Sequence, residues 1–227
     1  MLEQLEQRNM LIVPLDDQRQ WYRYHNLFAD ILRTYLVTTY PERVPVLHQR
    51  ASHWYEQNGW QSEAIQHALV IEDYGRAADL IEMTWPALFN DYRPATLLGW
   101  IKALPEDIVR NRPVLNLGGT WTLLRAGDME GAEGHLQDAE RWFDSDTAES
   151  SELVITNRQA SRTLSEYIIT ARIYLSQAQG DWTRAVDYCR RLFELTTEDQ
   201  YYARGIAEFL AGFSHWAIGD LTVAYQT

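Results

Sequence analysis

Several residue types are scarce in this chain, and each scarcity removes a class of protein or site. The 227 residues include a single cysteine, Cys189, so no disulfide can form within the chain. Cys189 lies among apolar neighbours on a predicted helix, where a buried structural thiol is expected rather than a nucleophile. Lys102 is the only lysine, and no Gly-x-x-x-x-Gly-Lys-Ser/Thr sequence occurs, so the sequence holds no phosphate-binding loop of that type.

Long apolar runs are also missing. No stretch approaches the roughly 20 apolar residues that a membrane-spanning helix needs. Residues 1–6 lack the basic start and the following apolar segment of a secretory signal peptide. We therefore expect a cytoplasmic protein that makes no contact with a membrane.

Positive charge is in short supply in most of the chain. The formal net charge is −12, from 20 Lys and Arg against 32 Asp and Glu. Residues 1–50 hold six acidic and six basic residues, so the whole excess falls in residues 51–227. An acidic surface repels phosphate backbones, which makes this segment a poor candidate for binding nucleic acid directly.

What the chain does contain is a short turn that recurs. Gly-Asp dipeptides begin at positions 127, 180 and 219, and each is followed by an alanine four residues after the Asp; looser copies lie at 59–64 and 73–78. The Gly can end one helix at positive φ, and the Asp can cap the next helix. The repetition predicts an all-α fold, an α-solenoid of tetratricopeptide-like antiparallel helix pairs. Spacings of 53 and 39 residues make it looser than a strict ~34-residue repeat.

The first 42 residues differ from the rest. Residues 10–15 and 21–24 are β-prone runs separated by a turn-like segment, which predicts a β-hairpin. Residues 25–40 have one continuous apolar face and predict a helix that Pro41 ends. A hairpin followed by a helix is how a winged-helix domain finishes, so we interpret this part as a winged-helix remnant.

Apolar stripes at helical spacing fill most of the remaining chain. We expect a first helical-repeat block at residues 43–145 and a second at 146–227, after the winged-helix end at 1–42. Pro86 should kink or break the helix that contains it. Residues 144–151 are polar and acidic without apolar period, which predicts an exposed loop.

Two stretches carry a resemblance to a known family. Residues 5–16 and 21–32 resemble the end of the winged helix in large ATP-binding transcriptional regulators of the LuxR family, the MalT-like signal-transduction ATPases. Residues 48–59 and 63–69 are similar to the helical segment that follows in those regulators. The resemblance covers roughly residues 2–145, and the remainder is similar only through its generic repeats.

The resemblance implies a function for the chain in a bacterial signal-transduction protein. It would be the sensor middle of a regulator whose nucleotide-binding and DNA-binding domains lie elsewhere, so ATP or ADP is implied only for the full-length protein and no cofactor is expected here. The implied partners are a small-molecule inducer or a regulatory protein, with DNA bound only through a domain absent here; oligomerisation of the full-length protein stays open. A stand-alone tetratricopeptide-like scaffold for protein–protein interaction remains the alternative.

Candidate site residues follow from the resemblance and from the aromatics. By the resemblance, His25 with Arg23 would contact the nucleotide and report its state, while the alternative is that His25 caps its helix or packs on Trp21. A ligand or partner surface is suggested by aromatic residues that can stack on sugars or peptides, against the alternative of core packing; these residues are Trp142, Tyr167, Tyr201, Tyr202 and Trp216.

Neither metal binding nor catalysis is expected of this chain. His48 and His53 are five residues apart, which does not place them on one helical face, and no cysteine accompanies them or His67. No spacing suggests a Ser/His/Asp or Cys/His arrangement. We therefore expect no metal site and no enzyme activity.

Overall fold

The computed structural model describes residues 11–18, 22–90, 94–144, 158–197 and 200–226, and of these it describes only the backbone at 86–90, 142–144, 158–163 and 202. The chain forms two compact units, Met1–Ile71 and Glu72–Thr227. Each unit is described by itself. The domain boundaries expected from the sequence stay predictions.

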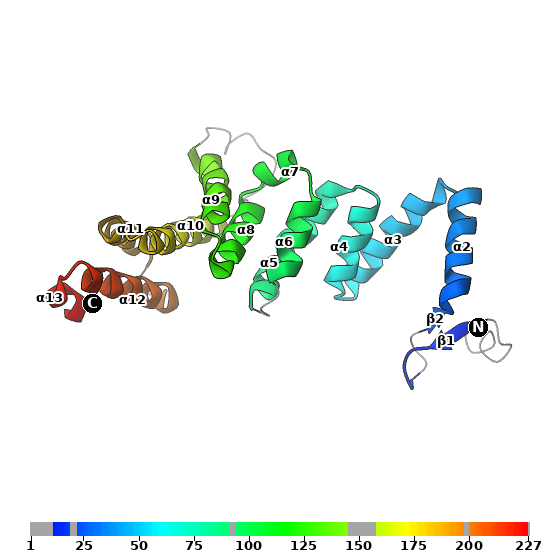
Figure 1. Ribbon diagram of the computed structural model, residues 1–227, viewed down its shortest axis with the longest axis horizontal. Coiled ribbons are helices and arrows are strands. Elements are labelled where there is room, and N and C mark those ends of the chain that lie inside the picture. Colours follow the sequence, from blue (N-terminus) through cyan, green and yellow to red (C-terminus); the bar gives the residue numbers. More distant parts are fainter. Residues whose placement is uncertain (1–10, 19–21, 91–93, 145–157, 198–199, 227) are drawn as a thin grey trace. The chain divides into compact units, whose positions relative to one another are not determined.

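The first unit begins with the hairpin that the sequence predicts. Strands β1 (Ile12–Pro14) and β2 (Tyr22–Tyr24) pair antiparallel, with Ile12 opposite Tyr24 (Figure 1). The backbone N–H of His25 donates to the carbonyl of Leu11 at 2.6 Å, which ties the hairpin to the start of the next helix. The predicted hairpin is confirmed.

Three helices follow the hairpin in this unit: α2 (Asn26–Thr39), α3 (Arg43–Gln57) and α4 (Gln61–Val70). Helices α3 and α4 form an antiparallel pair around Gly59, which has φ +80°, and the hydroxyl of Ser52 donates to the carbonyl of Ala64 at 2.8 Å inside it. In contrast, none of the residues of α2 is buried, and Leu27, Ile31 and Tyr35 are more than half exposed.

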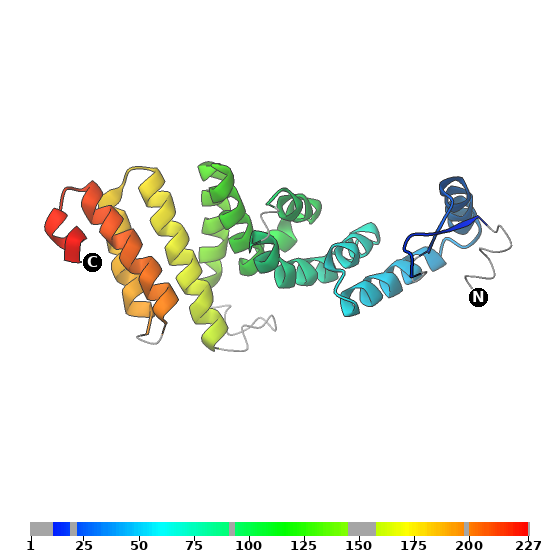
Figure 2. The same cartoon turned by 90° about the horizontal axis from the view of Figure 1, so that it is seen from below.

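The second unit is helical throughout its described residues. Its elements are α5 (Tyr74–Asn90), α6 (Pro94–Ala103), α7 (Glu106–Arg110), α8 (Pro113–Ala126), α9 (Met129–Asp144), α10 (Arg158–Ala178), α11 (Trp182–Leu195), α12 (Tyr201–Ala217) and α13 (Leu221–Gln226). Helices α8 and α9, α10 and α11, and α12 and α13 form successive antiparallel pairs, and α11 also lies beside α12 (Figures 1 and 2). The predicted all-α helical-repeat fold is confirmed.

The recurring Gly-Asp turn has the geometry that its sequence predicts. Gly127, Gly180 and Gly219 have φ values of 80°, 76° and 85°, a left-handed conformation that glycine adopts without a steric penalty. At the second turn the carboxylate of Asp181 accepts from the N–H of Arg184 at 3.1 Å and so caps α11. Equivalent caps occur at Asp128 and Asp220, at 2.9 and 3.3 Å.

Some local expectations differ from the structure. Pro86 does not break its helix, since α5 continues to Asn90, and the alternative of a kink stays a prediction. Leu80, Ile81 and Trp85 are buried just before it, and this packing offsets the hydrogen bond that proline removes. The short helix α7 was not predicted, and the expected loop at 144–151 lies almost wholly outside the described residues.

Among the described residues, two apolar clusters join successive helix pairs of the second unit. One joins α8, α9 and α10 through Leu117, Leu136 and Leu175, and the other joins α10, α11 and α12 through Ile173, Leu192 and Leu210. Each of these six side chains is at most 2% exposed. The contacts between successive pairs are therefore mostly apolar, and this makes a charged exception between α9 and α10 informative.

Candidate functional site

A charged cluster joins α9 to α10 in the second unit. The guanidinium of Arg172 on α10 donates to both carboxylate oxygens of Glu133 on α9, at 2.7 and 2.8 Å. It also donates through Nε, at 2.7 Å, to one carboxylate oxygen of Glu140, which lies seven residues after Glu133 on α9. Its Nη2 donates to the other oxygen of that carboxylate. The Arg172 side chain is only 15% exposed, so this is a partly desolvated ion-pair cluster rather than a surface salt bridge.

The cluster carries one net negative charge. Hydrogen bonds to Glu140 raise the pKa of Arg172 against the opposing effect of burial. Burial raises the pKa of Glu133, but hydrogen bonds from Arg172 and Gln137 and the positive charges of Arg172 and Arg184 outweigh it, so the pKa ends below its ordinary value. Two carboxylates face one guanidinium, which leaves an excess of hydrogen-bond acceptors on α9.

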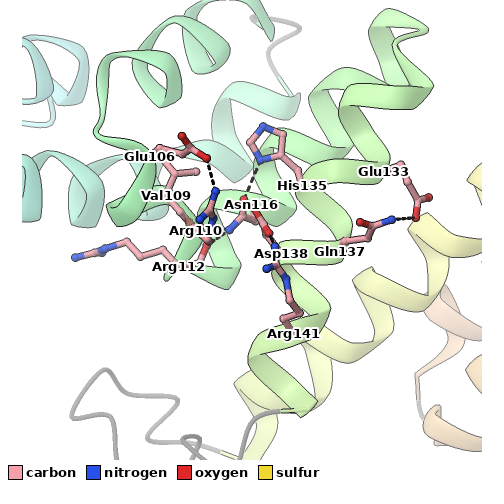
Figure 3. Close-up of polar contacts among 10 residues, drawn as sticks. All are labelled: Glu106, Val109, Arg110, Arg112, Asn116, Glu133, His135, Gln137, Asp138 and Arg141. Atoms are coloured by element: carbon pink, nitrogen blue, oxygen red, sulfur yellow. Dashed lines mark hydrogen bonds and ion pairs between the residues drawn. The ribbon is translucent and has the colours of Figure 1, made fainter.

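This cluster forms one wall of a polar pocket of about 400 Å³ between α9, α10 and α11. Leu175 is the only apolar residue in its lining; the others are Glu133, Gln137, Glu140, Arg172, Ser176, Gln179, Arg184 and Tyr188. Gln137 donates to Glu133 at 2.8 Å, as the dashed line in Figure 3 shows. Within the described part of the chain, the guanidinium of Arg184 makes neither an ion pair nor a hydrogen bond.

The neighbouring repeats have uncharged residues at the positions equivalent to these charges. Arg172 stands eight residues before its turn glycine, where the neighbouring pairs have Gly119 and Ala211. Glu133 and Glu140 stand six and thirteen residues after theirs, and the equivalent positions on α11 are Val186 and Phe193. Ala211 is 5% exposed within an apolar cluster against which Phe193 packs. One interface is thus apolar where the other is charged.

Arg184, the second arginine of the pocket, also has uncharged residues at the equivalent positions of the other pairs. Arg184 lies four residues after Gly180, and the equivalent positions in the other two pairs are Gly131 and Val223. Both arginines therefore replace glycine of the preceding pair. Aligning the chain on its turn glycines would have identified these residues, but composition and helical periodicity alone did not.

The structure places the predicted nucleotide-contact residues on the surface of the first unit. His25 is exposed at the N-cap of α2, and its side chain makes no capping hydrogen bond. Arg23 is exposed on β2. Their role toward a nucleotide stays a prediction.

The three predicted aromatic residues with described side chains do not gather at one site. Tyr167 packs edge-to-face with Trp85 and Trp121, at centroid distances of 6.2 and 6.5 Å. Trp216 stacks on Phe213 at 5.9 Å, and Tyr201 is 82% exposed at the start of α12. The side chains of Trp142 and Tyr202 lie outside the described residues. Of the three predicted aromatics with described side chains, Tyr167, Tyr201 and Trp216, none lines the polar pocket.

Histidines that were assessed as separate residues come together in the first unit. Nδ1 of His48 on α3 lies 2.7 Å from Nδ1 of His67 on α4, and the ring of Tyr55 stacks on His67 at 5.4 Å. Among the described residues no group of three or more His, Cys, Asp or Glu side chains is arranged to hold a metal ion. Nor does any described helix combine the length and apolarity that crossing a membrane requires.

Further polar contacts stabilise the second unit away from the pocket. Asn116 is fully buried; its amide donates to the carbonyls of Val109 and Arg112, and its oxygen lies 2.8 Å from Nδ1 of His135 (Figure 3). The guanidinium of Arg112 reaches α5, where it pairs with Asp79 at 2.6 Å and Glu82 at 3.1 Å. Every group in these contacts has a partner, so we assign them to structure.

The described residues thus form a β-hairpin and a helix, followed in the chain by helical repeats. Residues 1–44 match the family described as the MalT winged helix domain. This match confirms the resemblance to MalT-like regulators that the sequence indicates.

Two curated relatives extend the comparison. The chain is 36% identical over 142 residues to the serine/threonine-protein kinase PknK of Mycobacterium tuberculosis (strain ATCC 25618 / H37Rv), which is 61% of this chain and 13% of that protein. It is 35% identical over 121 residues to the HTH-type transcriptional regulator MalT of Yersinia enterocolitica, which is 53% of this chain and 13% of that protein. The chain therefore spans only a small part of these relatives. No solved structure matches.

Proposed function

We propose that the chain is the regulatory segment of a LuxR-type transcriptional regulator. In this proposal its tetratricopeptide-like helical repeats sense a small-molecule inducer or a regulatory protein, and they couple this event to nucleotide and DNA binding carried by other segments. The match of residues 1–44 to the MalT winged helix supports the class.

The two relatives support a regulatory rather than a catalytic role. One is named a kinase and the other a transcriptional regulator, yet 61% and 53% of this chain align with them, so the aligned regions must overlap. A segment shared by proteins with different named activities suits a common regulatory module. We propose accordingly that this segment has no enzyme activity, holds no cofactor and works in the cytoplasm, with ATP or ADP held elsewhere.

The observation that carries the sensor role is the polar pocket around Arg172. Its charged cluster occupies an interface that the next repeat builds from apolar residues, and replacing a buried ion pair with apolar residues often leaves stability unchanged or raises it. Folding alone therefore does not explain why this interface is charged, whereas binding of a ligand would explain it.

A second candidate is a docking surface for a partner protein, the role of a repeat scaffold. The stacked rings of Phe213 and Trp216 on α12 are 42% and 61% exposed, and exposed aromatics are common at protein–protein contacts. This candidate would act through α12 and not through the pocket.

A chimeric regulator tests the proposed function. This segment would replace the corresponding segment of the Yersinia MalT regulator, and reporter transcription would be screened against small metabolites. We expect at least one compound to change transcription through the chimera but not through the parent regulator. A chimera that binds its promoter and responds to no compound and to no partner protein would contradict the sensor role.

A further inference from the structure

The pocket offers hydrogen-bond donors on its α11 side. The guanidinium of Arg184 is exposed at the pocket and has no ion-pair or hydrogen-bond partner within the described residues, and Gln179 and Tyr188 line the pocket with it. A planar guanidinium forms two parallel hydrogen bonds with a carboxylate, which makes arginine well suited to bind that group. This side of the pocket therefore fits a carboxylate.

The α9 side offers the opposite chemistry. Glu133 and Glu140 share one guanidinium, so acceptor oxygens and one negative charge remain in excess there. An ammonium group carries three donors and a positive charge, and it fits that surplus. The pocket as a whole contains two glutamates and two arginines, so it suits a ligand without net charge.

Taken together, the geometry points to a ligand of defined class. We propose that the pocket binds a small zwitterion, a free amino acid or a short peptide, with its carboxylate on Arg184 and its ammonium on Glu133 and Glu140. A volume of about 400 Å³ is ample for such a molecule and lies within the usual range for small-ligand sites. The inference deepens the proposed function and rests on it in one respect, that the helical repeats sense a small molecule.

Other ligand classes fit the pocket less well. An apolar compound would meet a lining in which only Leu175 is apolar. A dianion would be repelled by the excess carboxylate of α9, and a neutral polyol would form no ion pair with the exposed guanidinium of Arg184. Only a ligand with both a negative and a positive group can pair with Arg184 on one side of the pocket and with Glu133 and Glu140 on the other.

The direct test is binding to the whole chain. Each standard amino acid and the dipeptide glycylglycine would be added at millimolar concentration, the melting temperature recorded, and the best binder measured by calorimetry. Binding to the folded chain raises its melting temperature by mass action. The N-acetyl and the amide derivatives of the best binder each remove one charge, and each should bind at least about tenfold more weakly.

Matched variants locate the site. Arg184→Val installs the residue of the third helix pair and should weaken binding about 10- to 100-fold. The triple change Glu133→Val, Arg172→Ala, Glu140→Phe copies the apolar α11–α12 interface and should abolish binding. Arg190→Val is the control, because Arg190 lies on the same helix with a 68% exposed side chain outside the pocket, and it should bind as the unchanged chain does.

The outcomes separate this inference from the proposed function. Binding of D-glucose or succinate with no response to any amino acid or to glycylglycine would overturn the ligand class while leaving a small-molecule sensor. Equal binding by the Arg184→Val and Arg190→Val variants would overturn the site. A chimera that responds to an inducer while the purified chain binds no zwitterion would overturn the inference and leave the proposed function standing.

Discussion

The guanidinium of Arg172 lies 2.7 Å from a carboxylate oxygen of Glu133, at a position where the next pair of helices packs an alanine. Because this contact is partly desolvated, removing one partner costs more than replacing the whole cluster. Arg172→Ala alone should lower the free energy of unfolding by about 2–3 kcal/mol, since two carboxylates then face each other. The triple apolar change should stay within about 1 kcal/mol of the unchanged chain or exceed it.

Chemical denaturation of the two variants checks this prediction. If the triple variant is as unstable as Arg172→Ala, the charges are needed for folding, and the argument that they are kept for a ligand fails.

The close approach of α8 and α9 predicts opposite effects for two helical glycines. A Cβ at Gly119 would lie 3.1 Å from the ring of His135, so the ring must move and weaken its 2.8 Å contact with Asn116. Gly119→Ala should therefore destabilise the chain by about 1–2 kcal/mol. Gly134→Ala, on α9 with nothing within 4 Å, should stabilise it by about 0.5–1 kcal/mol through helix propensity. Thermal melts of both variants give the comparison, and a stabilising Gly119→Ala would show that His135 is not held against α8.

The carboxyl of Glu82 makes stability depend on pH. Burial raises its pKa from 4.5 to about 7, against the opposing charge of Arg112. The folded state therefore keeps a proton that the unfolded state releases, and stability is lost as pH rises between these two values. Glu82→Gln should remove that loss, so its stability relative to the unchanged chain should rise by roughly 3 kcal/mol between ~pH 4 and ~pH 8.

Urea unfolding at several pH values measures the difference. Glu106→Gln is the control, because the Glu106 side chain is 84% exposed and paired with Arg110 on its own helix. If the free energy of unfolding changes with pH in the same way for Glu82→Gln and for Glu106→Gln, the pKa of Glu82 is not raised in the folded chain.

The paired histidines predict a pH response of the opposite sign in the first unit. Burial and then the charge of His48 lower the pKa of His67, while Glu63 raises it. The unfolded state takes up a proton at the ordinary pKa of 6.5, whereas the folded state does so only at a lower pH. The contribution of His67 to stability is therefore complete above pH 6.5 and is lost as the pH falls below that value. His48→Gln removes a positive charge and should raise the pKa of His67, as measured by NMR titration of its ring protons.

His53→Gln is the matched control for this titration, since His53 is exposed and bonds only to the carbonyl of Gln49 on its own helix. If both variants leave the pKa of His67 unchanged, the two imidazoles do not interact in solution.

Structural features formed by residues close together in the sequence could be predicted, whereas contacts between side chains of different helices could not. The turns at Gly127, Gly180 and Gly219 could be predicted because they depend only on neighbouring residues: the glycine adopts a left-handed conformation, and the aspartate caps the next helix. The β-hairpin followed because its two strands are adjacent in the chain. Aligning the chain on its turn glycines marks Glu133, Glu140 and Arg172 as unusual. That these residues meet, and that His48 meets His67, could not be predicted, because each contact joins different helices and tertiary packing decides which side chains meet.

The most direct measurement of the central claim is the response of the chimeric regulator with and without the charged interface. We predict that a compound which changes reporter transcription through the chimera loses its effect when Glu133, Arg172 and Glu140 carry the apolar residues of the α11–α12 interface, while Arg190→Val responds normally. An undiminished response from the apolar variant would contradict the account, because the segment would then sense its signal at a site other than the pocket between α9, α10 and α11.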